Sequence, residues 1–425
     1  MSLNLPQSGR VVVIDDCSKE ALPLMKVLSS NRISVNYFTG RFEELPEKPF
    51  SDVRLVFLDI VLEGGEGTDD KTKLSTTMSI IEKIIDKKNG PFILAIWSKH
   101  EELIEKMGKM LKGQKYQPIV TDLQKYEFKD DRTGDYNFNL VKIEKKLKEK
   151  MENLGIFEIL ILWENIIYDS ASSVVNEFSK FVEFDNDWND KLNGILYKLA
   201  KAWAGKTLDI DSPREIVKNA LFTFNGMFVD TLEKKLHEES YNQMDFSFSE
   251  SGIEGEVKGK INSKLLLDKS RFDGLYPGNV YEIDEKEHIS KNLDTTDSME
   301  IEEIKNNSIS VIVEVSPFCD FAQKKMELSR IVKGFLCPIE VQINGRIIQA
   351  AKNKIKPAVF IYKTSVIEYN EKLYSLVVDF KHFSAKPINE INEKTPIFRL
   401  RKDILNDIRT KLTSHINRLG VLSLE

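Results

Sequence analysis

The chain has 425 residues, which is more than one ordinary hydrophobic core accommodates and therefore indicates two or three domains. Its composition, 41% hydrophobic and 30% charged, excludes a disordered or membrane-embedded protein and is typical of a soluble globular one. Because 61 basic side chains stand against 67 acidic ones, the formal charge of -6 gives no general attraction to nucleic acid or to an anionic membrane.

The ends and the cysteines indicate the cellular compartment. The N-terminal segment MSLNLPQSGR lacks the apolar core and cleavage site of a secretory signal, and the apolar stretch 156–163 is too short to span a membrane. Cys17, Cys319 and Cys337 are widely spaced, which predicts neither a zinc site nor a disulfide framework. We therefore expect a cytoplasmic protein without membrane association.

Residues 1–152 alternate between apolar strand-like runs and amphipathic helical segments. Short unbroken runs of Val, Ile, Leu and Phe are typical of strands buried on both faces of a parallel sheet. The alternation predicts an α/β fold with a doubly wound, five-stranded parallel sheet. The expected strands are 11–14, 35–38, 55–58, 92–96 and 119–120, and the expected helices contain 22–28, 78–85, 103–111 and 143–151. The polar stretch 63–75 is expected to form a flexible loop.

Residues 153–245 show a different pattern, with apolar residues at helical spacing and recurring tryptophans. They predict a helical domain or linker bundle. One helix start is clearly marked, because Ser212 can cap it, Pro213 suits its first turn and Glu215 completes a capping box.

Residues 246–425 predict a β-rich α+β domain of unknown function. An Asn344-Gly345 turn is expected to join two strands as a hairpin. The acidic stretch 284–307 is expected to be a mobile loop, and a last helix is expected over 403–419. The other expected strands are 261–267, 280–283, 310–315 and 358–362.

Acidic residues follow two of the strands in the first domain. Asp15 and Asp16 come directly after the strand 11–14, and Asp59 follows the strand 55–58. In an open parallel sheet the ligand crevice lies outside the carboxyl ends of the strands, where strand order reverses. The three carboxylates are therefore expected to meet there and to offer a hard-oxygen site for Mg²⁺.

With three further residues, these acids resemble the receiver domain of response regulators, which has a flavodoxin-like fold. Gly67 stands downstream of Asp59, Ser98 ends the strand-like run ILAIWS, and Lys125 lies in TDLQKYEF. The resemblance covers about the first third of the chain, and is to a divergent type that occurs in bacterial conflict and phage-defence operons.

The resemblance implies a role for each polar residue. Asp59 would be the phosphoacceptor, Asp15 and Asp16 would hold Mg²⁺ together with Asp59, and Ser98 would contact the phosphoryl group. Lys125 would supply a fixed positive charge, although Lys115 or Lys129 could take that place. Such charges are needed because a carboxylate is a weak nucleophile toward phosphorus.

Three positions depart from the family pattern. Glu63 and Tyr126 stand where prolines are typical, and Lys99 follows Ser98 where a small residue is usual. These departures leave open a pseudo-receiver that acts as a scaffold without being phosphorylated.

The segment SPFCDFAQKK is the other conspicuous motif. Cys319 and Asp320 lie where a strand is expected to give way to a helix, so Cys319 could be a nucleophile with His382 or His415 as its base. The competing interpretation is that Cys319 is a small buried apolar residue and Asp320 a helix cap. A C-terminal enzyme regulated by the receiver is thus a further alternative.

The sequence predicts a bacterial-type signalling protein rather than an enzyme, apart from its own phosphorylation and dephosphorylation. A partner histidine kinase or phosphotransfer protein would supply the phosphoryl group. The helical and C-terminal domains would transmit or sequester it, in a context such as phage defence. A protein partner at these domains and a homodimer are left open, and the acidic balance disfavours nucleic acid.

Overall fold

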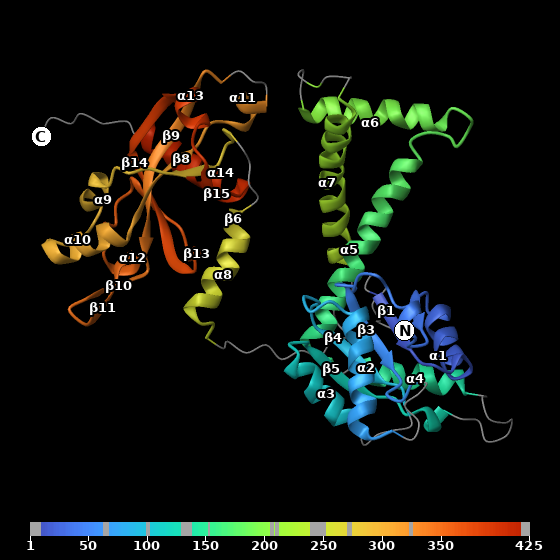
Figure 1. Ribbon diagram of the computed structural model, residues 1–425. Helices are drawn as coiled ribbons and strands as arrows, with labels where there is room; N and C mark the ends of the chain where they lie inside the picture. Colours follow the sequence, from blue (N-terminus) through green and yellow to red (C-terminus); the bar gives the residue numbers. More distant parts are fainter. Residues whose placement is uncertain are drawn as a thin grey trace, which may run out of the picture. The chain divides into compact units, whose positions relative to one another are not determined.

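The computed structural model describes residues 10–62, 68–98, 103–128, 138–151, 154–204, 208, 212–238, 252–269, 274–322 and 326–417. The chain divides into two compact units (Figure 1). The first unit contains residues 1–200 and 217–248, and the second contains residues 201–216 and 249–425. No helix in the described part of the chain combines the length and the apolar character needed to cross a bilayer.

A five-stranded parallel sheet forms the centre of the first unit, with strand order β2-β1-β3-β4-β5. This order is compatible with a receiver-like fold and agrees with the predicted α/β class. The strands are β1 (Arg10–Ile14), β2 (Val35–Phe38), β3 (Val53–Leu58), β4 (Phe92–Ile96) and β5 (Pro118–Asp122). The helices are α1 (Ser18–Ser30), α2 (Asp70–Ile84), α3 (Ile104–Gly113) and α4 (Leu140–Met151), with short 3₁₀ turns η1 (Phe42–Glu44) and η3 (Lys125–Phe128).

Both faces of this sheet are buried, which explains the unbroken apolar runs. Because successive side chains of a strand point to opposite faces, Val11 and Val13 belong to one core cluster, and Val12 and Ile14 belong to another. Residues of α1, α4 and the following helix complete the first cluster, and residues of α2 and α3 complete the second.

The predicted loop 63–75 is wrong in its second half. Helix α2 begins at Asp70, and the Asp69 carboxylate caps it by accepting a hydrogen bond from the Thr72 amide at 2.9 Å. The part of the prediction that falls on residues 63–67 lies outside the described residues.

The predicted helical middle region consists of α5 (Ile156–Ser179), α6 (Trp188–Ala204) and α7 (Pro213–Glu238), drawn in green in Figure 1. Pro213 is the first residue of α7, as predicted, and the Ile216 amide donates to the Ser212 carbonyl oxygen. At its beginning, α5 contributes Phe157 and Ile161 to the core of the parallel sheet.

The second unit is built on an antiparallel sheet with the path β12-β14-β9-β8-β7-β15-β6, and β13 pairs with β14. Strands β10 and β11 form a separate hairpin. The strands are β6 (Leu267–Asp268), β7 (Asn279–Glu282), β8 (Ile309–Glu314), β9 (Leu328–Pro338), β10 (Glu340–Ile343), β11 (Arg346–Gln349), β12 (Ile361–Lys363), β13 (Ile367–Tyr369), β14 (Lys372–Pro387) and β15 (Pro396–Leu400). The helices are α8 (Gly255–Leu266), α9 (Glu287–Lys291), α10 (Ser298–Asn307), α11 (Phe318–Ala322), α12 (Ala350–Asn353), α13 (Ile388–Asn392) and α14 (Lys402–Ile416).

The predicted Asn344-Gly345 hairpin is confirmed. It joins β10 to β11, and both turn residues have positive φ, 48° and 77°. Two positive φ values are characteristic of the type I′ turn, whose twist matches that of the flanking strands.

Two predictions for the second unit are wrong. Residues 255–266 form helix α8 where a strand over 261–267 was expected, and only Leu267 at its end belongs to a strand. The expected loop 284–307 contains α9 and α10, whose Ile289 and Ile304 are fully buried. The expected strand 358–362 is shorter and starts at Ile361. The last helix ends at Ile416, and the end of the prediction falls on residues 418–419, outside the described residues.

Candidate functional site

Four predicted polar residues lie at the carboxyl edge of the parallel sheet. Asp15 directly follows β1 and Asp59 directly follows β3, while Ser98 comes two residues after β4. The strand ends are level because Ile14 pairs with Leu58, which in turn pairs with Ile96. The turn η3 begins at Lys125, three residues after the end of β5, so the chain brings a lysine to the same edge.

The ammonium of Lys125 lies among three carboxylates. Its Nζ is 2.5 Å from Asp59 Oδ2, 2.8 Å from Asp15 Oδ2 and 2.9 Å from Glu20 Oε2. The lysine side chain is fully buried. A buried ammonium of this kind is stable only because the carboxylates offset its desolvation.

The second oxygen of Asp59 is also occupied. Oδ1 accepts a hydrogen bond from Ser98 Oγ at 2.8 Å and another from the Val61 amide at 3.2 Å. Asp59 and Ser98 are both nearly buried, with 8% and 2% of their surface exposed. The two oxygens of Asp59 therefore face different partners, a lysine on one side and a hydroxyl on the other.

Asp15 is fixed by the backbone around it. Its Oδ1 accepts from the Cys17 amide at 2.9 Å, and the Tyr37 hydroxyl donates to its carbonyl oxygen at 2.7 Å. Burial raises the pKa of Asp15 to about 6, even though Lys125 acts in the opposite direction. Burial alone would lower the pKa of Lys125, but the charges of Asp59 and Asp15 outweigh it and raise that pKa above its ordinary value.

The cluster of carboxylates could hold a metal ion. Asp15, Glu20 and Asp59 each place a carboxylate oxygen within 4.8 Å of the others. With all three ionised, their charge exceeds that of Lys125, and oxygen donors of this kind suit hard divalent cations.

The set of carboxylates differs in one member from the predicted metal ligands. Glu20 belongs to the cluster, whereas Asp16, which is half-buried, is not one of its three members. Sequence reasoning missed Glu20. A signal was available, because Glu20 is the third residue of α1 and lies in its first turn, which follows Asp15 and the end of β1.

The structure distinguishes two of the three candidate lysines. Lys125 contacts Asp59, while Lys115 lies in the turn before β5, at the opposite end of that strand. Lys129 lies outside the described residues, as do Glu63, Gly67 and Lys99. Tyr126 is described and is 53% exposed.

The second motif lies in the second unit. Cys319 belongs to helix α11, which begins four residues after the end of β8, but its side chain lies outside what the structure describes. The carboxylate of Asp320 lies 3.8 Å from Arg330 in β9. His382 Nε2 is 3.6 Å from Asp379 Oδ2, and the His415 ring packs near Phe380. The proposed role of Cys319 as a nucleophile therefore stays a prediction.

Comparison of the chain with known proteins does not identify a family for it. Neither a protein-family model nor a curated protein matches the chain. The class that the first unit suggests therefore depends on the strand order and the acidic cluster, which are compatible with a receiver-like fold.

Proposed function

We propose that the first unit is a receiver that accepts a phosphoryl group on Asp59 from a partner histidine kinase or phosphotransfer protein. The observation that carries the proposal is the environment of Asp59, whose two oxygens contact Lys125 at 2.5 Å and Ser98 at 2.8 Å. An acceptor carboxylate needs both a fixed positive charge and a hydroxyl that can follow the new phosphoryl oxygens.

In the proposed transfer, a carboxylate oxygen of Asp59 forms the new bond to phosphorus. The bond between phosphorus and the kinase histidine breaks, and the histidine nitrogen keeps the electron pair. Lys125 remains beside Asp59 and offsets the negative charge that gathers on the phosphoryl oxygens. Ser98 exchanges its hydrogen bond to Asp59 for one to the phosphoryl group.

Mg²⁺ is the metal that we propose for this site. Asp15 and Asp59 would hold it, with Asp16 or Glu20 as a further acidic ligand. Once bound, Mg²⁺ supplies positive charge to the phosphoryl oxygens. The fit comes from the excess of carboxylates over cationic side chains among the described residues of the cluster.

A packed route from the site to the helical region supports a signalling role. Trp97, next to Ser98 in the chain, is fully buried and stacks on Phe128 with ring centroids 5.6 Å apart. The same core cluster includes Phe157 and Ile161 of α5. A change of hydrogen-bond partner at Ser98 would therefore reach α5 through the packing of Trp97 and this core cluster. The helical and C-terminal regions would then transmit or sequester the signal.

A second candidate function is a pseudo-receiver that serves as a fixed docking module. The specific observation in its favour is Glu20, whose carboxylate is 2.9 Å from Lys125. With three carboxylate partners, the ammonium is fully satisfied without a phosphoryl group, so the arrangement is also stable as a permanent structural element.

Beryllofluoride distinguishes the two candidates, because it mimics a phosphoryl group on aspartate. Hydrogen exchange of the wild-type full chain is expected to slow around β3, β4 and α5 when beryllofluoride and Mg²⁺ are present together. Asp59→Asn should abolish the change, while Asp52→Asn, at an exposed ion pair with Arg10, should leave it intact. No Mg²⁺-dependent change in the wild type would overturn the receiver and favour the docking module.

A further inference from the structure

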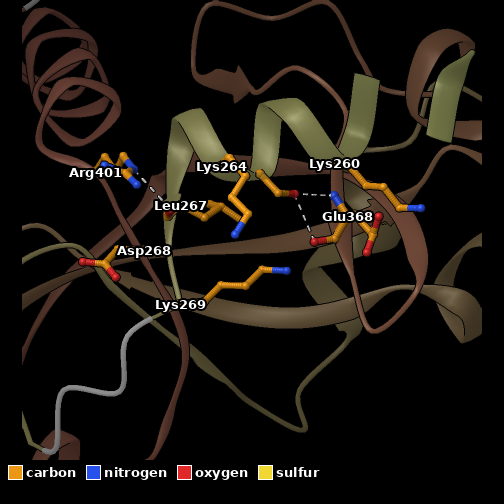
Figure 2. A pocket seen from close by; sticks show the side chains of 8 residues that line it. Lys260, Lys264, Leu267, Asp268, Lys269, Glu368 and Arg401 are labelled. Atoms are coloured by element: carbon orange, nitrogen blue, oxygen red, sulfur yellow. Dashed lines mark hydrogen bonds between the residues drawn. The ribbon is translucent and has the colours of Figure 1, made fainter. Parts of the chain in front are cut away.

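The second unit contains a basic pocket at the edge of its sheet, which Figure 2 shows from close by. The pocket has a volume of about 340 Å³ and lies between α8, the edge strand β6 and β13. Four basic and two acidic side chains line it: Lys260, Lys264, Lys269, Arg401, Asp268 and Glu368. The lining therefore has an excess of positive charge, in a chain whose formal charge is -6.

The charges of this pocket are only partly balanced. Asp268 forms an ion pair with Arg399, and Lys260 forms one with Glu256. Within the described residues, Lys264 and Lys269 have no hydrogen-bond or ion-pair partner. Both side chains extend into the pocket in Figure 2, where their ammonium groups point into the same space. Two converging ammonium groups repel each other unless an anion lies between them.

The pocket has a firm frame. The Ser263 hydroxyl of α8 accepts a hydrogen bond from the Glu368 amide at 2.6 Å. The same hydroxyl donates to the Glu368 carbonyl oxygen at 3.1 Å. On the other side, Arg401 donates from Nε to the Leu267 carbonyl oxygen at 3.2 Å. Ser263 thus joins α8 to β13, and Arg401 joins β6 to the start of α14, so Lys264 projects from a fixed helix.

A second pocket adjoins the first at Lys269, which lines both. It has a volume of about 370 Å³, and its lining includes Asn279 and the aromatic ring of Tyr369. Asn279 is fully buried, and its Nδ2 donates to the Gly274 carbonyl oxygen and to the Tyr281 hydroxyl, both at 3.1 Å. Its Oδ1 accepts no hydrogen bond from the described residues. This oxygen is enclosed by protein, so a molecule in the second pocket would contact the ring of Tyr369 rather than Asn279 Oδ1.

We propose that these adjoining pockets bind a small organic phosphate of the nucleoside monophosphate class. The phosphate group lies between Lys264 and Lys269, close to Arg401, where it neutralises the converging ammonium groups. The rest of the ligand passes Lys269 into the second pocket and stacks on Tyr369. Pockets of this size enclose a small molecule rather than a nucleic-acid strand.

The test measures binding of AMP and of inorganic phosphate to the full chain by calorimetry, without Mg²⁺. We expect AMP to bind at least about tenfold more tightly than inorganic phosphate, because only AMP reaches the second pocket. Lys264→Gln/Lys269→Gln should weaken AMP binding by about a hundredfold, since two charged contacts are lost. Lys386→Gln is the control and should change the affinity less than about twofold, because Lys386 lines neither pocket and forms only an exposed ion pair with Glu390.

Several results would overturn the proposal. These are the absence of AMP binding at millimolar concentration, equal affinities for AMP and inorganic phosphate, and equal losses in the double variant and Lys386→Gln. Displacement of AMP by an oligodeoxythymidine at comparable concentration would indicate a nucleic-acid surface instead. Binding of AMP that persists in Asp59→Asn would place the ligand away from the first unit, and its loss in that variant would contradict the assignment.

Discussion

The guanidinium of Arg54 in β3 forms a bidentate ion pair with the carboxylate of Glu164 in α5. Nε is 2.9 Å from Oε2 and Nη2 is 2.7 Å from Oε1. Both side chains are mostly buried, with exposed fractions of 18% and 28%. A planar, two-point contact of this kind is stronger than an exposed ion pair, and it fixes α5 against the sheet.

Removing this contact should loosen α5. We expect Arg54→Met to reduce the local stability of α5 by about 1.5 kcal/mol, because Glu164 then loses its partner near the core. Hydrogen exchange of α5 peptides measures the effect. Lys87→Gln, which removes an exposed ion pair at 3.6 Å, is the control and should leave the exchange of α5 unchanged. Equal exchange in both variants would show that apolar packing alone holds the helix.

Replacing Lys125 should destabilise the first unit strongly. In Lys125→Met, three carboxylates face one another without their buried cation. We expect the free energy of unfolding to fall by about 3 kcal/mol or more. Hydrogen exchange of peptides from β1 and β3 reports the change. Lys115→Met, at the other end of β5, is the control and should cost less than about 0.5 kcal/mol. An equally small loss of unfolding free energy in Lys125→Met would show that the Lys125 ammonium does not stabilise the cluster of carboxylates.

Binding of Mg²⁺ should depend on pH through Asp15. Burial raises the pKa of Asp15 from 3.8 to about 6, so the folded protein favours its neutral form. The resulting contribution to stability is complete below about pH 4 and is lost as the pH rises through 6. Because the metal needs the carboxylate, the affinity for Mg²⁺ should increase about tenfold between pH 5 and pH 7.

Calorimetry at several pH values measures this dependence. Asp15→Asn should bind Mg²⁺ more weakly and should lose the change between pH 5 and pH 7. A wild-type affinity that is constant over this range would show that Asp15 does not ligate the metal.

Replacing Ser98 should weaken the response of α5 while leaving the acceptor Asp59 in place. In Ser98→Ala, Asp59 keeps its contact with Lys125 but loses the hydroxyl donor at 2.8 Å. We expect beryllofluoride to bind about tenfold more weakly and the protection of α5 to disappear. Ser98→Thr retains a hydroxyl and should preserve both. An unchanged response in Ser98→Ala would exclude Ser98 as the switching residue.

The main polar residues of the candidate site could be identified from the sequence because they follow strands that are easily recognised. Asp15, Asp59 and Ser98 lie just beyond apolar runs, and the ends of parallel strands meet at one edge of the sheet. Glu20 was not identified because its position depends on how α1 packs, and a first-turn acid is more often a simple helix cap.

Local patterns were less informative in the second unit. The acidic stretch that contains α9 and α10 has few apolar residues, yet Ile289 and Ile304 are fully buried in a shared core cluster with Phe335. Tertiary packing therefore stabilises helices that composition alone does not predict. Residues of α8 were interpreted as a strand because their apolar run is short, and such runs do not distinguish the two structures by periodicity.

The anchoring of α5 has a mechanical consequence. Its first turns are fixed in the core by Phe157 and Ile161, while the helix continues to Ser179. With 24 residues it is about 36 Å long, so a tilt of about 10° at the anchored end displaces the far end by about 6 Å. The sheet would then act as the pivot of this helix, and a change in packing around Trp97 that tilted α5 by this angle would move its far end by about the length of one helical turn.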